Sequence, residues 1–200
     1  QAASTRYRLQ QFIPKLEESG IHIDVNYLLD NEYINKTFSG LPFEPLSVMK
    51  SYLNRLNILL SQRKYNLIFL RTEGFPLLPG YIESMLFRIP YIYDFDDALY
   101  LKYKTNKLGV FKPVLGGKFD TIVSRAAAVL AGNEHLAKYS LKLNPKTIIL
   151  PTVVDMERYT CSGSSRDSVF TVGWIGSPST SMYLAEMVAP LSVLGSEAPV

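Results

Sequence analysis

The sequence has very few of the residues that build disulfide frameworks or metal clusters. One cysteine, Cys161, and two histidines, His22 and His135, occur in 200 residues. An internal disulfide framework and a cysteine-based zinc cluster are therefore excluded, and little remains for a histidine-rich metal site. The sequence also has no uncharged apolar run close to the ~18 residues that a membrane-spanning helix needs.

Neither sign of charge dominates. The 21 basic and 18 acidic side chains give a net charge of +3, which is too small to indicate a nucleic-acid partner. Hydrophobic residues make up 47% of the chain, enough to bury a sizeable core. The first residues carry two arginines and no signal-peptide pattern. We therefore expect a cytoplasmic protein that contacts a membrane at most from its surface.

Helix-like and strand-like segments alternate along the chain. The clearest helical pattern covers 45–63, where Leu46, Met49, Leu53, Leu56 and Leu60 recur at intervals of three and four residues. Other predicted helices cover 4–19 with a kink at Pro14, 77–87, 112–125, 134–143 and 179–194. Predicted strands cover 21–28, 66–70, 91–93, 127–131, 147–150 and 169–175. This alternation predicts an α/β fold, a Rossmann-like parallel sheet with helices on both faces.

Polar residues follow several predicted strands, where ligands bind in parallel sheets. These residues are Arg71 and Glu73; Asp94, Asp96 and Asp97; Asn133 and Glu134; and Gly176, Ser177 and Thr180. Arg6 and Arg8 lie in the first turns of a predicted helix, where they oppose the helix dipole and so indicate an anionic or polar ligand. We expect Arg71 and Glu73 to pair with each other or with Arg6.

Each group also has a purely structural interpretation. An aspartate after a strand often caps the next helix, and an arginine is often simply exposed. Three aspartates within four residues repel one another, so a cation, arginines or sugar hydroxyls must compensate. The turn at 176–180 suits a phosphate at a helix N-terminus, but by itself the pattern favours a plain serine-capped strand-to-helix turn.

Five segments then stand out by their order and spacing. They are 3–8, 93–98, 131–136, 151–159 and 172–177. Together they resemble the family 4 retaining glycosyltransferases of bacteria, which have the GT-B fold of two Rossmann-like domains facing across a cleft. The resemblance covers nearly the whole chain.

The resemblance implies a division of the chain into an acceptor domain over 1–160, a linker over 161–168 and the truncated beginning of a donor domain over 169–200. The first strand of the family fold would precede residue 1, and later donor-site residues would follow residue 200. We therefore expect the chain alone to be inactive, and its unpaired strand edges to favour self-association.

The implied activity is transfer of a sugar, with retention, from a nucleotide-diphosphate sugar to a hydroxyl of a glycan or a lipid-linked acceptor, with no metal or other cofactor. Such a reaction belongs to the synthesis of cell-surface glycans or glycolipids. The resemblance assigns catalysis to Asp96 and Asp97, with Asp96 where the family commonly has histidine. The assigned substrate-binding residues are Arg6, Arg8, Arg71, Glu73, Asp94, Asn133 and Glu134, and the assigned donor-phosphate residues are Gly176, Ser177 and Thr180.

Three alternatives stay open. Asp94-x-Asp96 could be the metal-binding Asp-x-Asp motif of the other glycosyltransferase fold. The chain could be a non-catalytic module that binds a sugar or nucleotide, or part of a sugar-nucleotide epimerase, since these enzymes share the GT-B fold. A complete donor domain would favour an enzyme, and a secretion signal would favour the binding module.

Overall fold

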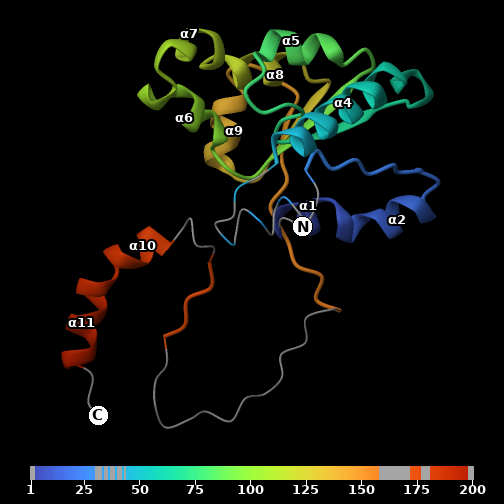
Figure 1. Cartoon of the computed structure of the whole chain (residues 1–200). Helices are drawn as coiled ribbons and strands as arrows, with labels where there is room; N and C mark the ends of the chain where they lie inside the picture. Colours follow the sequence, from blue (N-terminus) through green and yellow to red (C-terminus); the bar gives the residue numbers. More distant parts are fainter. Residues whose placement is uncertain are drawn as a thin grey trace. The chain divides into compact units, whose positions relative to one another are not determined.

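The computed structural model describes residues 3–29, 33, 36, 39, 42, 44–157, 172–176 and 181–197. The chain divides into two compact units, Gln1–Tyr159 and Thr160–Val200. The first unit contains a β-sheet and most of the helices, whereas the described part of the second forms the helices α10 (Ser181–Glu186) and α11 (Val188–Glu197) (Figure 1).

Four parallel strands form the sheet of the first unit. They are β1 (Ile68–Arg71), β2 (Tyr91–Phe95), β3 (Ala128–Ala131) and β4 (Thr147–Ile149), hydrogen-bonded in the order β1-β2-β3-β4. In the register, Leu70 lies opposite Tyr93, and Tyr93 opposite Val129. Helices flank the sheet, which confirms the predicted α/β, Rossmann-like class.

Helices precede β1 and connect each strand to the next, as parallel pairing requires. They are α4 (Pro45–Leu60), η2 (Gln62–Lys64), α5 (Gly80–Leu86), α6 (Leu99–Lys104), η3 (Asn106–Phe111), α7 (Lys112–Leu115), α8 (Lys118–Arg125) and α9 (Glu134–Ser140). The predicted first helix is interrupted: α1 (Ala3–Arg8), η1 (Gln10–Phe12) and α2 (Ile13–Glu18) follow one another. Pro14 lies in the first turn of α2, where its missing N–H has no intrahelical partner to lose.

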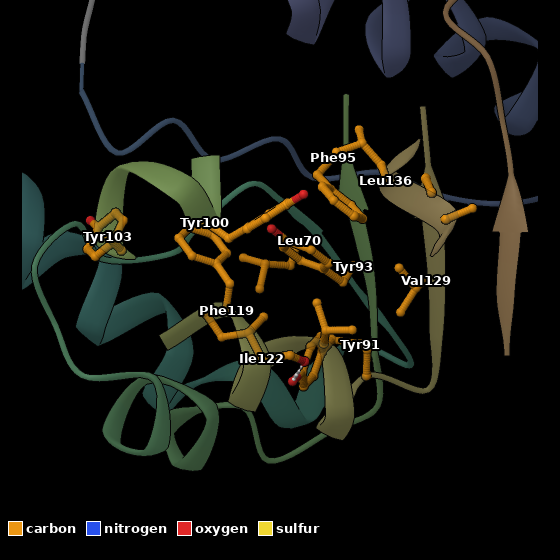
Figure 2. Packing of buried hydrophobic residues seen from close by; sticks show 14 of the residues in the cluster. Leu70, Tyr91, Tyr93, Phe95, Tyr100, Tyr103, Phe119, Ile122, Val129 and Leu136 are labelled. Atoms are coloured by element: carbon orange, nitrogen blue, oxygen red, sulfur yellow. Dashed lines mark hydrogen bonds between the residues drawn. The ribbon is translucent and has the colours of Figure 1, made fainter. Parts of the chain in front are cut away.

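The core lies on one face of the sheet and is rich in aromatic residues. Tyr91, Tyr93 and Phe95 alternate along β2 and are therefore on the same face. Phe119 and Ile122 of α8 pack against them, and the Tyr91 hydroxyl donates to the Ile122 carbonyl at 2.6 Å (Figure 2). Burial of this tyrosine raises its pKa. The hydrogen bond explains how a phenol is tolerated inside the core.

Two predicted strands are wrong where they are described. Residues 21–27 are irregular, with Ile21 half exposed, and side chains hold the segment: Tyr65 donates to Asp24 at 2.7 Å, and Arg55 to Asn26. Residues 172–176 are also irregular, and 169–171 lie outside the described residues. A strand needs a partner for its backbone groups, and the described part of the second unit contains no other strand.

The helix predicted over 45–63 is confirmed by α4, but its apolar stripe is not buried. Leu46, Met49, Leu53 and Leu60 are each more than half exposed. α4 instead packs through its other side, where Leu59 is buried and Tyr52 lies 5.6 Å from the ring of Phe75. The spacing therefore predicted the helix, while tertiary contacts determined which side of it is covered.

Candidate functional site

The candidate site lies at the carboxyl ends of β1 and β2. Asp94, in β2, alternates with Tyr93 and Phe95 and so points to the face opposite the aromatic core. Arg71, the last residue of β1, is its partner in the register and lies on the same face. Asp94 is fully buried despite its charge. A buried carboxylate requires compensating partners, and the surrounding elements supply them.

Four side chains form what we call the arginine cluster: Arg8, Arg71, Asp94 and Asp96. The Arg8 Nε donates to both oxygens of Asp94 at 3.1 and 3.0 Å, and its Nη2 also contacts Oδ1. Arg71 donates from Nη1 to Asp94 at 2.6 Å and from Nη2 to Asp96 at 2.6 Å. Two positive and two negative charges therefore balance, with charge-assisted hydrogen bonds throughout.

Arg8 also links the cluster to the chain after β4. Its Nη1 donates to the Leu150 carbonyl at 2.7 Å and to Thr152 Oγ1 at 3.2 Å. Three residues later, Gln11 donates to the Val153 carbonyl at 2.9 Å. Arg8, at the end of α1, thus joins β2 to the segment that follows β4, and its side chain is only 1% exposed.

The cluster reaches solvent through Asp96. Its side chain is 24% exposed, compared with 0% for Asp94 and 11% for Arg71. One Asp96 oxygen accepts from Arg71, which fixes the orientation of the carboxylate and leaves acceptor positions on the solvent side. The Nε of Arg71 is buried and makes no hydrogen bond within the described residues. The structure thus presents an anchored carboxylate at a sheet edge.

The turn after β3 passes directly over Asp96. A Cβ on Gly132 would lie 2.8 Å from the Asp96 Cα, closer than real Cβ atoms approach backbone. The Gly132 N–H donates to the Phe95 carbonyl at 2.9 Å, which holds the two turns together. Only glycine fits this approach, so Gly132 determines how closely the β3 turn packs on the site.

The other predicted residues of this edge have local roles. Asn133 caps α9 by accepting from the Leu136 N–H at 3.0 Å, and Asp97 is exposed and accepts from the next N–H, that of Ala98, at 2.7 Å. Glu134 is exposed in the first turn of α9. Arg6 is also exposed, with its guanidinium 4.9 Å from the Tyr7 ring. None of these contacts joins them to the arginine cluster.

The expected pairing of Arg71 with Glu73 or Arg6 is wrong. Glu73 instead belongs to a second group, the lysine cluster, formed by Glu73, Glu83, Tyr103 and Lys118. The buried Lys118 Nζ lies 2.7 Å from Glu73 and 2.9 Å from Glu83. Tyr103 donates to Glu73 at 2.8 Å. The two carboxylates can approach each other because the ammonium lies between them.

The lysine cluster holds the loop between β1 and α5. Lys118 also donates to the Phe75 carbonyl, and Glu83 accepts from the Gly74 N–H at 2.6 Å. The loop contains two non-glycine residues with positive φ, Thr72 at 66° and Leu77 at 62°, a conformation that costs energy for side chains of these types. Burial raises the pKa of Glu83, although Lys118 and the Gly74 N–H oppose that rise.

Sequence reasoning missed Lys118 and Glu83. Both lie inside predicted helices, where charged residues are usually assumed to face solvent. One signal was available: Lys118 precedes Phe119 and lies four residues before Ile122, so it shares the core-facing side of that helix. A charge on that side requires a buried partner, although the sequence does not identify the partner.

The donor-phosphate prediction is only partly within the described residues. Gly176 is exposed and irregular, whereas Ser177 and Thr180 lie outside the described part of the chain. In the first unit, a hollow of about 420 Å³ lies beside the segment that Arg8 holds. Its lining comes from Gln11 and Phe12 and from residues 153–157, which include Asp155 and Glu157.

The hydrogen bonds of Asp94 argue against the metal-binding Asp-x-Asp alternative. Such a motif offers free carboxylate oxygens to a divalent ion. Both oxygens of Asp94 instead accept hydrogen bonds from guanidinium groups of Arg8 and Arg71. A cation at Asp94 would have to displace the guanidinium groups of Arg8 and Arg71, so the arrangement does not suit that motif.

No protein-family model matches this chain, and no curated protein matches it. The glycosyltransferase resemblance therefore stays a prediction. Among the described residues, no helix is long and apolar enough to cross a bilayer.

Proposed function

We propose that the chain is part of a retaining glycosyltransferase, which transfers a sugar from a nucleotide-diphosphate sugar to an acceptor hydroxyl. The first unit would form the acceptor side of the site, and the second unit would begin the donor side. The resemblance of five segments motivates the proposal. The observation that supports it best is the anchored, solvent-reaching carboxylate of Asp96 at the carboxyl edge of a parallel sheet.

The chemistry fits this carboxylate. Breaking the bond between the anomeric carbon and the diphosphate oxygen leaves positive charge on the sugar, and a fixed negative charge stabilises it. Asp96 is fixed by Arg71, which is itself held by Asp94 and lies only 11% exposed. In this proposal Asp96 contacts the sugar, the exposed Asp97 offers a second acceptor for its hydroxyls, and Arg8 and Arg71 position the carboxylates.

A binding experiment on the 200-residue chain tests the carboxylate role. Titration calorimetry with a panel of nucleotide-diphosphate sugars and simple glycosides should detect a sugar ligand. Asp96→Asn should weaken its binding at least about tenfold, because a neutral amide replaces a charged acceptor. Asp120→Asn is the matched control. Asp120 is also a partly exposed aspartate in an ion pair, but its partner is Lys104, which is not part of the arginine cluster.

Transfer itself is tested in the longest protein that the gene encodes. Release of nucleoside diphosphate together with a new glycosidic bond, lost in Asp96→Asn but not in Asp120→Asn, supports the enzyme. Sugar binding without any transfer in that protein would favour the non-catalytic module. Unchanged binding and unchanged transfer in Asp96→Asn would contradict the role given to the arginine cluster.

A further inference from the structure

A threonine with a left-handed backbone forms the turn at the carboxyl end of β1. Thr72 has φ 66°, and across it the Glu73 N–H donates to the Arg71 carbonyl at 2.9 Å. A three-residue turn with positive φ at its centre is rare and strained. The strain is especially unfavourable for a β-branched residue such as threonine, because its Cβ crowds the backbone. The turn therefore persists only because its surroundings hold it.

Both neighbours of Thr72 are held by ion pairs. Arg71 belongs to the arginine cluster, and Glu73 belongs to the lysine cluster, where it lies 2.7 Å from Lys118. The Thr72 N–H donates to the Asp94 carbonyl at 3.0 Å, which continues the β1–β2 ladder by one residue. Two ionic clusters and a ladder hydrogen bond thus hold the strained turn. Strained residues that are held from several sides are typical of functional sites.

The Thr72 side chain, unlike those of its neighbours, makes no polar contact in the described part of the fold. The residue is partly buried, and its hydroxyl forms no hydrogen bond with the described residues. Glycine adopts positive φ without strain, so closing the turn does not by itself require threonine. The residue lies at the carboxyl edge of the sheet, directly after Arg71, which holds Asp96 at 2.6 Å. What threonine adds at this edge is an unused hydroxyl.

We propose that Thr72 is a ligand-binding residue of the candidate site and that its hydroxyl contacts an oxygen of the sugar. This inference rests on the proposed sugar transfer and adds a residue to it. The carboxylates of Asp96 and Asp97 can only accept hydrogen bonds, whereas sugar oxygens also accept them and so need donors. The Thr72 hydroxyl can donate, which the carboxylates cannot. Both clusters then serve one turn, since together they fix Thr72 at the edge where Asp96 is anchored.

Leu77 provides an internal contrast in the same loop. Its φ of 62° is close to that of Thr72, but it lies five positions further on, near the start of α5. Its side chain is apolar and 66% exposed, so it cannot hydrogen-bond a sugar. Its N–H donates to the Tyr103 hydroxyl at 3.2 Å. The two residues share the backbone strain and differ in the chemistry of the side chain.

Titration calorimetry with the 200-residue chain tests the hydroxyl, with UDP-, GDP- and dTDP-hexoses and methyl hexosides as the ligands. Thr72→Val keeps the β-branched shape and removes the hydroxyl, so it should weaken sugar binding at least about threefold. Thr72→Ser returns the hydroxyl and should recover most of that loss. Equal binding by the unaltered chain and Thr72→Val would overturn the proposal. Equal weakening in Thr72→Val and Thr72→Ser would also overturn it, because the hydroxyl would not be responsible.

Urea unfolding tests whether the strain is retained for binding. Thr72→Gly and Leu77→Gly should each raise the folding equilibrium constant about twofold or more, because glycine relieves the positive-φ strain. Thr72→Gly should also weaken sugar binding at least as much as Thr72→Val does, whereas Leu77→Gly should leave it unchanged. A lower folding equilibrium constant in Thr72→Gly would mean that the side chain serves the fold, against the proposal. Weakened binding in both glycine variants would assign the effect to the loop backbone and would also contradict it.

Asp96→Asn separates this inference from the proposed sugar transfer. Sugar binding that is weakened by both Asp96→Asn and Thr72→Val supports both. Binding that is weakened by Asp96→Asn and not by Thr72→Val overturns only the role of Thr72. If no ligand of the panel binds, the proposed function fails, and the role of Thr72 fails with it.

Discussion

The arginine cluster and the lysine cluster are both ionic groups buried beside β1, but they differ in where they end. The arginine cluster joins α1, β1, β2 and the chain after β4, and it reaches solvent through Asp96. The lysine cluster joins the β1–α5 loop to α5 and α8, and its Lys118 and Glu83 are fully buried. Similar pairings therefore serve different ends: one presents a carboxylate, and the other holds a loop in place.

The difference teaches how to separate a candidate site from a structural ion pair. Burying charged groups is costly, and replacement by apolar residues is often neutral or stabilising, so neither cluster is explained by stability alone. A cluster with one side chain at the surface can contact a ligand. In the lysine cluster the most exposed carboxylate, Glu73, is 14% exposed and is held by Lys118 and Tyr103, so this cluster acts mainly through the loop that it positions.

Asp94→Ala should have the largest effect on stability. It would leave Arg8 and Arg71 without their shared partner, and removal of one member of a buried ion pair typically costs about 3–5 kcal/mol. Urea unfolding followed by far-ultraviolet circular dichroism measures this, since the single tryptophan, Trp174, lies in the second unit. Asp97→Ala, at an exposed neighbour, should change the free energy of unfolding by less than about 1 kcal/mol. Equal losses in both variants would mean that Asp94 does not anchor the arginines.

Lys118→Met should have the second-largest effect on stability. It should lower the free energy of unfolding by about 3 kcal/mol, because Glu73 and Glu83 would lose the cation between them. Adding Glu83→Gln to that variant should restore part of the loss, since the buried carboxylate is then neutral. The double-mutant cycle therefore gives the coupling between the two side chains directly. Additive losses would show that the lysine cluster is not a coupled unit.

The smallest expected effect is a change in the free energy of unfolding with pH. Burial raises the pKa of Glu83 in the folded chain above its usual value of 4.5. A proton on Glu83 therefore stabilises the fold at low pH, and that contribution is lost as the pH rises through the folded-state pKa. Relative to Glu83→Gln, the unaltered chain should lose stability as the pH rises above about 4.5. Unfolding curves at several pH values compare the two, and parallel pH profiles would contradict the shift.

The sequence predicted the sheet better than it predicted the contacts of the site. The apolar runs at 66–70, 91–93, 127–131 and 147–150 all became strands, because short apolar segments between helices are covered most easily in a parallel sheet. The segment 21–28 has an equally regular alternation but is irregular in the structure, because alternation predicts a face and not the presence of a neighbouring strand.

In the candidate site too, local sequence patterns predicted positions but not partners. The sequence placed Arg71 and Asp94–Asp97 at one sheet edge, and Arg8 was selected for its position near a helix start. The pairing of Arg8 with Asp94 spans 86 residues, and no local pattern predicts a contact of that separation. Glu73 and Lys118, 45 positions apart, are another such pair, and here the sequence suggested the wrong partner.

By itself, the sequence determined the α/β class, the order of the strands along the chain and the edge where polar residues collect, because hydrophobic periodicity and the right-handed crossover are local or topological rules. Only the tertiary structure decided which charges meet and which side of α4 is covered. Those features depend on burial by elements distant in the sequence, and the free energy of a charge or an apolar side chain is set by its surroundings rather than by its neighbours along the chain.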